Sequence, residues 1–451
     1  MKEDFLHFVW RLRRFRQKGL QTTTGDAVEV LVPGQHNHNA GPDFLDARIR
    51  IGGTLWAGNV EMHLRSSQWL AHGHETDPNY DNVILHVVLE EDVVICHSDG
   101  VRIPCLNLRP YLSPSLAHQY LRLLHSEDWI PCQPQLHRVP DINRQIWLDR
   151  LLVERLEHRT QQLAERLKKN QQDWEETFYQ RFAWALGLRV NADAFLMLAE
   201  SLPLKVLLRH RDSLRQLEAL LFGQAGLLEE EFADEYPRLL QQEYLFLRKK
   251  FGLEPISANH WKFMRMRPAN FPTVRLAQWA TLLFRTGQLF GKMLVAQNVR
   301  EIENALVVEL SNYWQTHYRF DKESVKNPKR LGKARIHLLI INIIAPFIFF
   351  YGKERGEDQY QERALRLLEE VPTEKNQVLK QWEQIGIKAE QAAQGQALLH
   401  LKQQYCDKRR CLECAFGAQL LKRPLRAEEE AELYLPIWWL ESAAENKSEE
   451  L

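Results

Sequence analysis

From about residue 20 to residue 110 the hydrophobic pattern is that of β-strands, with alternating apolar and polar positions at 27–32 and a compact apolar run at 82–90. A Gly-Gly turn joins the second run to the third, and the runs cover residues 27–32, 44–52, 54–64 and 82–90. Residues 92–108 are typical of a hairpin that turns at Asp99-Gly100. Residues 2–18 instead carry apolar side chains at helical spacing. The pattern predicts a helix, three strands, a crossover over residues 66–80 and a returning strand.

Helical periodicity dominates from about residue 113 onward. Apolar residues at helical spacing, with charges between them, recur over residues 142–170, 175–187, 213–228, 235–251, 273–295, 299–313, 333–351, 358–370 and 374–384. The predicted fold class is α+β, with an α/β domain and mixed sheet followed by a large all-helical region. We expect the α/β domain at 1–112, a junction at 113–140, a helical domain ending in a cysteine cluster at 141–440, and a flexible tail at 441–451.

One run, residues 336–352, is apolar enough to suggest a membrane span. It contains His337 and Asn342, is interrupted by Pro346 and is short for a bilayer, so a buried core helix is expected and no membrane partner. The N-terminus has acidic residues at once and no export signal. The six cysteines form no evenly spaced disulfide framework. A cytoplasmic protein is therefore expected.

Two acids and a histidine stand at the ends of neighbouring predicted strands. Glu61 and His63 share one face of their strand because side chains alternate with period two. Asp43 follows Pro42 at the start of the adjacent strand. Carboxylates and water suit Mg²⁺ or Mn²⁺, and such an ion could activate water beside a phosphoryl group. His63 is either a general base or a ligand. Alternatively, Asp43, Glu61 and His63 are ordinary polar residues at the ends of strands and bind no metal.

Histidines are dense around this motif. His72 and His74 form a His-x-His pair in the crossover, where both rings can face one metal and contact a scissile phosphate. The competing interpretation is that His72 and His74 cap the crossover segment and hydrogen-bond to the backbone near the sheet. His86 lies within an apolar run and is expected to be a core residue.

A set of motifs resembles a bacterial domain of unknown function, family 2851. They are GPDF at 41–44, GNVEMH at 58–63, NVILHVV at 82–88 and RPANFPTVRLAQ at 267–278. The order of elements also resembles the PD-(D/E)xK nuclease superfamily, which implies a restriction-endonuclease-like core. By that resemblance Asp43 matches the first acid, Glu61 the second and Glu3 the acid of the first helix, while His63 stands where lysine is expected.

Three cysteines, Cys406, Cys411 and Cys414, follow a C-x4-C-x2-C spacing in a polar segment. Two thiolates separated by two residues can reach one ion, and Cys132 at the junction is the candidate fourth ligand. A 4Fe-4S cluster and a zinc ion are both compatible with these ligands. Iron–sulfur nucleases of the same superfamily show a similar arrangement with different spacing. Cys96 and Cys105 are expected to be core residues.

The overall charge is balanced, with 59 basic and 59 acidic residues, so only local patches could attract DNA or RNA. Arginines crowd residues 11–16, and residues 262–270 and 326–335 are also basic. Such runs either bind phosphates or are solvated helix faces. The leading hypothesis is a metal-dependent phosphodiesterase of nuclease type. The alternatives are an inactive nuclease-like scaffold that binds nucleic acid or protein, and a zinc metallohydrolase that uses the His-rich loop.

Overall fold

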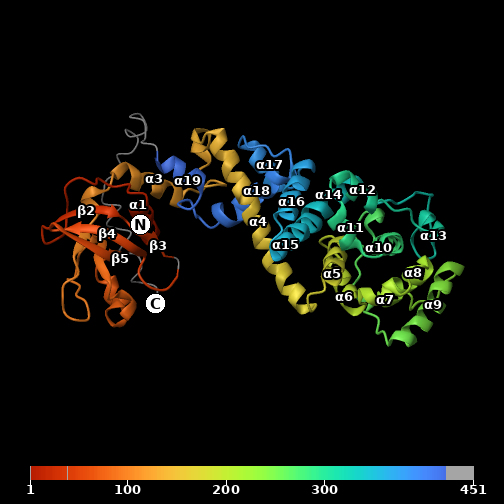
Figure 1. The fold of residues 1–451 in the computed structure, drawn as a ribbon. Helices are drawn as coiled ribbons and strands as arrows, with labels where there is room; N and C mark the ends of the chain where they lie inside the picture. Colours follow the sequence, from red (N-terminus) through yellow and green to blue (C-terminus); the bar gives the residue numbers. More distant parts are fainter. Residues whose placement is uncertain (1, 38, 423–451) are drawn as a thin grey trace. The chain divides into compact units, whose positions relative to one another are not determined.

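The computed structural model describes residues 2–37 and 39–422, and the chain divides into two compact units (Figure 1). The first unit contains residues 1–147 together with the segment from residue 401 onward, and the second contains residues 148–400. The segment with Cys406, Cys411 and Cys414 therefore belongs to the unit that contains the N-terminal sheet. The expected flexible tail at 441–451 lies outside the described residues.

A mixed sheet forms the core of the first unit. Its strands are β1 (Leu20–Gln21), β2 (Ala27–Val32), β3 (Gln35–His36), β4 (Phe44–Ile51), β5 (Thr54–Arg65), β6 (Val83–Glu90) and β7 (Cys105–Asn107). The order is β1-β2-β4-β5-β6-β7, and β3 pairs with β4. The pairs from β1 to β5 are antiparallel, whereas β5–β6 and β6–β7 are parallel. The expected α+β class with a mixed N-terminal sheet followed by helices is confirmed.

Alternation explains strands β2 and β4, whereas β6 is buried at consecutive positions. In β4, Ala47, Ile49 and Ile51 are buried while the residues between them are exposed. A β-bulge at Asp46, whose φ is +58°, shifts the register between Phe44 and Ala47. Gly58 in β5 has no room for a side chain, because a Cβ there would lie 2.7 Å from the carbonyl oxygen of Asn82. Close approach of the chain that enters β6 therefore requires glycine.

The expected hairpin over residues 92–108 is only partly formed. A single antiparallel bridge joins Cys96 to Arg102, and the chain then enters β7, which pairs in parallel with β6. Parallel pairing with a buried neighbour covers more apolar surface than an isolated hairpin does. Cys105 is buried as expected, but Cys96 is exposed, so its assignment to the core was wrong.

Short helices and turns complete the first unit around its sheet. Helix α1 (Glu3–Arg11) contacts β5 and is shorter than the expected 2–18, and α2 (Gln68–Ala71) also contacts β5. The crossover continues through two 3₁₀ turns, η1 (His74–Thr76) and η2 (Pro78–Tyr80). The remaining elements of the unit are η3 (Arg109–Tyr111), α3 (Pro114–His125), η4 (Gln133–Arg138), the start of α4 (Asp141–Lys169), the π-helical turn η8 (Leu401–Cys406) and α19 (Ala415–Lys422).

The second unit is mainly helical. It contains the rest of α4, α5 (Trp174–Leu186), α6 (Ala192–Ser201), α7 (Leu204–Leu208), α8 (Leu214–Gln224), α9 (Glu235–Phe251), η5 (Ala258–His260), η6 (Pro268–Asn270), α10 (Pro272–Thr286), α11 (Leu289–Val295), α12 (Val299–Leu306), α13 (Asn312–Thr316), β8 (His317–Arg319), β9 (Lys322–Glu323), α14 (Lys333–Leu339), η7 (Ile340–Ile344), α15 (Ala345–Arg355), α16 (Asp358–Glu370), α17 (Gln377–Gln384) and α18 (Ala392–His400). Helices α9 and α16 match the expected 235–251 and 358–370.

The apolar run at 336–352 lies within α14, η7 and α15. Residues 333–355 are long and apolar enough to cross a membrane by length and composition, and 72% of the most apolar stretch is buried inside the protein. Pro346 cannot donate a hydrogen bond to the turn before it, and the π-helical turn η7 lies at this point. Arg159 donates to the carbonyl oxygen of Ile341 and to the side chain of Asn342, which satisfies the polar groups of the widened turn.

Candidate metal centre

Strands β5 and β6 bring three polar side chains into the core of the first unit. Glu61 and His63 lie two positions apart in β5, and the parallel register places Glu61 opposite His86 of β6. All three are buried, with exposed fractions of 4%, 1% and 1%. Buried polar groups are costly unless they pair with one another or with a ligand. The expected role of His86 as a simple core residue is therefore incomplete.

Two hydrogen bonds hold Asp43 against strand β5. Its backbone N–H donates to Glu61 Oε2 at 3.1 Å, and its Oδ2 accepts from the backbone N–H of Met62 at 3.0 Å. The two acids that the sequence singled out thus lie side by side at the start of β4 and within β5. One carboxylate oxygen of each is used to hold this arrangement.

The crossover adds two more histidines. His72 directly follows α2, His74 begins η1, and Gly73 between them has a φ of +73°. A left-handed residue reverses the chain here, so the His72 and His74 rings come within 5.3 Å of each other, centroid to centroid. Tyr80 stacks on His74 at 3.9 Å and fixes the plane of its ring.

His63 is the hub of the histidine cluster. Its Nδ1 lies 2.9 Å from His86 Nε2, and its Nε2 lies 3.2 Å from His72 Nδ1. One ligand nitrogen from each of His63, His72 and His74 falls within 4.8 Å of the others. Glu61 Oε1 joins the same space, at 3.6 Å from His63 Nε2 and 3.4 Å from His74 Nε2.

These separations fit a single metal ion. With bonds of about 2.0–2.1 Å, the ligands of a tetrahedral zinc ion are roughly 3.4 Å apart. The distances from His63 Nε2 to His72 Nδ1, from Glu61 Oε1 to His74 Nε2 and from Glu61 Oε1 to His63 Nε2 are 3.2, 3.4 and 3.6 Å. The residues present therefore match a site of three imidazoles and one carboxylate, and such a set suits Zn²⁺, Fe²⁺ or Mn²⁺ better than Mg²⁺.

The electrostatics of the group favour a cation. Burial raises the pKa of Glu61 to about 9, and the charges of Asp43 and Glu3 add to the shift. Burial also raises the pKa of Glu3, as does Asp43. Three carboxylates thus crowd a space with little solvent, and a divalent cation would supply the missing positive charge.

The imidazoles are held in the form that binds metal. Burial lowers the pKa of His63 to about 2 and that of His86 to about 4, with neighbouring histidines adding to both shifts. Burial likewise lowers the pKa of His74. A neutral imidazole is the ligand form of histidine. Because the pKa of His63 is so low and both ring nitrogens are engaged, His63 is better suited to be a ligand than a general base.

Helix α1 contributes two residues to the same centre. His7 Nε2 lies 3.2 Å from Asp43 Oδ2, and Glu3 stands one turn earlier on the helix. Burial acts to lower the pKa of His7, but pairing with Asp43 and the charge of Glu3 outweigh it and raise the pKa. His7 was missed in the sequence. The signal was present as the Glu3–His7 spacing of four, which places both on one face of a helix.

The four cysteines expected to bind metal also lie together in space. In the sequence, all four follow the residues of the histidine site. Cys132, Cys406, Cys411 and Cys414 are all buried and free of disulfides. Each of them has an electrostatic interaction with at least one other member of the set.

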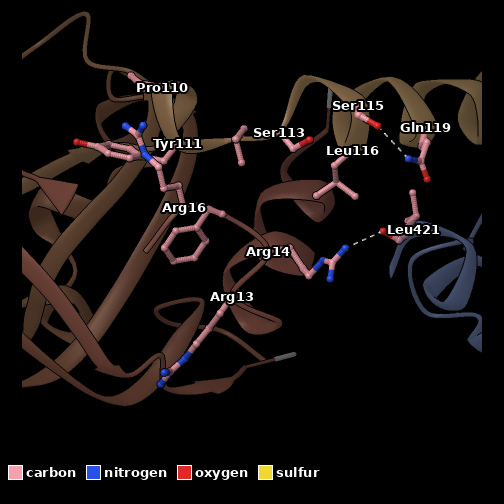
Figure 2. Close-up of a pocket in the computed structure, with 12 residues that line it drawn as sticks. Arg13, Arg14, Arg16, Pro110, Tyr111, Ser113, Ser115, Leu116, Gln119 and Leu421 are labelled. Carbon is pink, nitrogen blue, oxygen red and sulfur yellow. Dashed lines mark hydrogen bonds between the residues drawn. The ribbon is translucent and has the colours of Figure 1, made fainter. Parts of the chain in front are cut away.

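A basic pocket begins just after the end of α1 (Figure 2). It has a volume of about 550 Å³, and Arg13, Arg14 and Arg16 line it together with Tyr111 and Leu421. Arg14 donates to the carbonyl oxygen of Leu421 at 3.1 Å, and the Arg16 guanidinium lies 5.3 Å from the centre of the Tyr111 ring. The pocket thus combines positive charge with a half-buried aromatic ring.

Comparison with known proteins gives a family and no activity. No curated protein and no solved structure matches the chain significantly. A family model matches residues 3–377, which include every residue of the metal centre and Cys132 but not the segment with the other three cysteines. Because this match covers most of its length, the chain belongs to the family described as protein of unknown function (DUF2851).

Proposed function

We propose that the first unit is a metal-dependent phosphodiesterase of nuclease type. The observation that carries the proposal is the convergence of Glu61 Oε1 with ligand nitrogens of His63, His72 and His74 at the separations of one coordination shell. A metal ion held there lowers the pKa of bound water and neutralises charge on a phosphoryl oxygen. Asp43, beside Glu61, is positioned to bind a second solvent molecule or to complete the shell.

The proposed metal is Zn²⁺ or Mn²⁺. Three imidazoles in one shell disfavour Mg²⁺, which prefers oxygen ligands and retains its waters. His86 then acts behind the shell, because its Nε2 pairs with the His63 nitrogen that faces away from the metal. The proposed role of His63 is accordingly that of a ligand.

Two features support a nucleic acid as the substrate. The basic pocket lies beyond the C-terminal end of α1, and Glu3 and His7 lie near its other end, roughly 13 Å apart along a helix of this length. Phosphates of one strand can occupy both places. We further infer a core similar to that of PD-(D/E)xK nucleases from the order of α1, β2, β4, β5, a crossover and the parallel strand β6, although the two-residue strands β1 and β3 are additional, α2 is only four residues long and His63 stands where lysine is expected.

The test is hydrolysis of labelled single-stranded and duplex DNA and RNA with Zn²⁺, Mn²⁺ or Mg²⁺ supplied singly. We expect cleavage with Zn²⁺ or Mn²⁺, and a loss of about 100-fold or more in Glu61→Gln and in His72→Ala. His118→Ala, a histidine on α3 in the same unit, is the matched control and should retain full activity. Tight nucleic-acid binding with no turnover in any metal would instead identify an inactive scaffold.

A second candidate function is favoured by the same histidines. A shell of three imidazoles and one carboxylate also suits a zinc metallohydrolase of another class. Metal-dependent hydrolysis of simple carboxylic esters or amides, lost in His72→Ala while all four nucleic-acid substrates remain intact, would select this alternative over the phosphodiesterase.

A further inference from the structure

Four of the six cysteines of the chain meet at one place in the first unit. Cys132 directly precedes η4, Cys414 directly precedes α19, and these two elements contact each other. Cys406 ends the π-helical turn η8, and Cys411 lies between it and α19. Cys414 interacts electrostatically with each of the other three thiols, and Cys411 interacts in the same way with Cys132 and Cys406. Residues separated by 274 positions in the sequence, Cys132 and Cys406, are therefore neighbours in space.

The local backbone is shaped around the sulfurs. The backbone N–H groups of Phe416 and Gly417 and the side chain of Trp147 donate to the Cys414 sulfur. A side chain at Gly417 is impossible, because a Cβ there would lie 2.1 Å from the carbonyl oxygen of Cys411. Arg409 takes a φ of +55°, so the loop between Cys406 and Cys411 turns through a left-handed residue. Donors aimed at a cysteine sulfur are typical of thiolates that bind metal.

Simple packing does not explain this arrangement. All four cysteines are buried, so in the absence of a metal the protein would place four weak hydrogen-bond donors against one another in its interior. The segment between Cys406 and Cys411 has the sequence DKRR, which is too polar to be a hydrophobic core strand.

A zinc ion and an iron–sulfur cluster require different separations between their cysteine sulfurs. Zinc–sulfur bonds of about 2.3 Å place the sulfurs of a tetrahedral zinc site roughly 3.8 Å apart. Among the residues that the structure describes, the histidine triad is the group of three that closes to within 4.8 Å, and no trio of cysteines does. A cubane cluster holds its four cysteine sulfurs roughly 6 Å apart, because iron and sulfide fill the centre.

We propose that Cys132, Cys406, Cys411 and Cys414 bind a 4Fe-4S cluster. Residues 148–400 form the second unit, so they are inserted between the first of these ligands and the other three. The cluster clamps the chain where it leaves the first unit to the chain where it returns. It also fixes α19, whose Leu421 lines the basic pocket and accepts a hydrogen bond from Arg14. The proposal stands independently of any activity at the histidine site.

The test uses the full chain purified without oxygen. We expect about four iron and four acid-labile sulfide per chain, with visible absorption that dithionite bleaches. Cys411→Ser and Cys132→Ser should each lower the iron content at least about tenfold or convert the cluster spectrum. Cys105→Ser is the matched control, because Cys105 is buried in the same unit but belongs to β7.

Several outcomes would overturn the proposal. Zinc bound at one per chain and lost in Cys411→Ser would replace the cluster with a zinc site. Absence of iron from the wild-type chain, even after reconstitution with ferrous iron and sulfide, would remove the site altogether and needs no variant to fold. An unchanged cluster in Cys132→Ser would refute the assignment of the fourth ligand. His72→Ala should leave the iron and sulfide content unchanged, which separates this test from that of the proposed function.

Discussion

Replacement of His86 by phenylalanine is the most informative change outside the proposed coordination shell. His86 contacts no proposed metal position directly, yet its Nε2 lies 2.9 Å from His63 Nδ1 in a buried setting. When His63 Nε2 binds a metal, its Nδ1 carries the proton and donates to His86. In His86→Phe that N–H has no partner, and the His63 ring is free to rotate away.

The expected cost follows from the burial of this pair. Loss of an outer partner of a ligating histidine lowers metal affinity by roughly 10–100-fold, which is about 1.4–2.7 kcal/mol. An unsatisfied buried donor costs a similar amount, about 1–3 kcal/mol. The two estimates agree, so Kd should rise by at least tenfold. His86→Gln keeps an acceptor in reach of His63 and should recover most of the affinity.

Titration with Mn²⁺, with free Mn²⁺ counted by electron paramagnetic resonance, measures this affinity. Mn²⁺ is chosen because it prefers oxygen and imidazole ligands to thiolates, so the cysteines do not interfere. His118→Phe is the control for a generic histidine loss. A Kd for His86→Phe within twofold of the wild-type value, with the protein folded, would refute the supporting role of His86 and the assignment of His63 Nε2 as a ligand.

Three further predictions test separate features. Burial raises the pKa of Glu218 in α8 from 4.5 to about 8, so the folded state keeps a proton that the unfolded state has lost. The free energy of unfolding should therefore fall by up to about 1.4 kcal/mol per pH unit as pH rises between these values, and Glu218→Gln should flatten the slope in urea titrations. Gly73→Ala should destabilise the crossover by about 1–2 kcal/mol and weaken Mn²⁺ binding, measured by the same titration, because Ala resists the left-handed conformation. Arg16→Ala should weaken nucleic-acid binding and reduce its salt dependence by about one phosphate contact, measured by fluorescence anisotropy over a range of salt; an unchanged slope would exclude the basic pocket from the binding surface.

Much of the first unit was predictable because its signals are local. Period-two alternation located β2 at the expected residues, the two runs on either side of the Gly-Gly turn located β4 and β5 to within one residue, and a compact apolar run located β6 to within one residue. The convergence of Asp43, Glu61 and His63 also followed from local rules, since adjacent strands and period-two spacing bring them together. His72 and His74 were identified from their spacing, although the left-handed Gly73 that aims both rings inward is visible only in the structure.

The remaining features depend on long-range contacts that no local pattern encodes. The role of His86 arises from the parallel register of β5 and β6, and an apolar run gives no hint of a partner at 2.9 Å. The region after Asp92 alternates like a hairpin, but its last strand gains more by pairing with β6. The return of residues 401–422 to the first unit is set by packing of α19 on α3 and η4, after a 253-residue insertion counted from residue 148 to residue 400.

Anomalous X-ray diffraction from crystals of the metal-loaded chain, collected on both sides of the zinc and manganese absorption edges, tests the central claim most directly. The account predicts one zinc or manganese peak at bonding distance, about 2.0–2.2 Å, from Glu61 Oε1 and from nitrogens of His63, His72 and His74. A fully loaded crystal with no anomalous peak among these four side chains would contradict it.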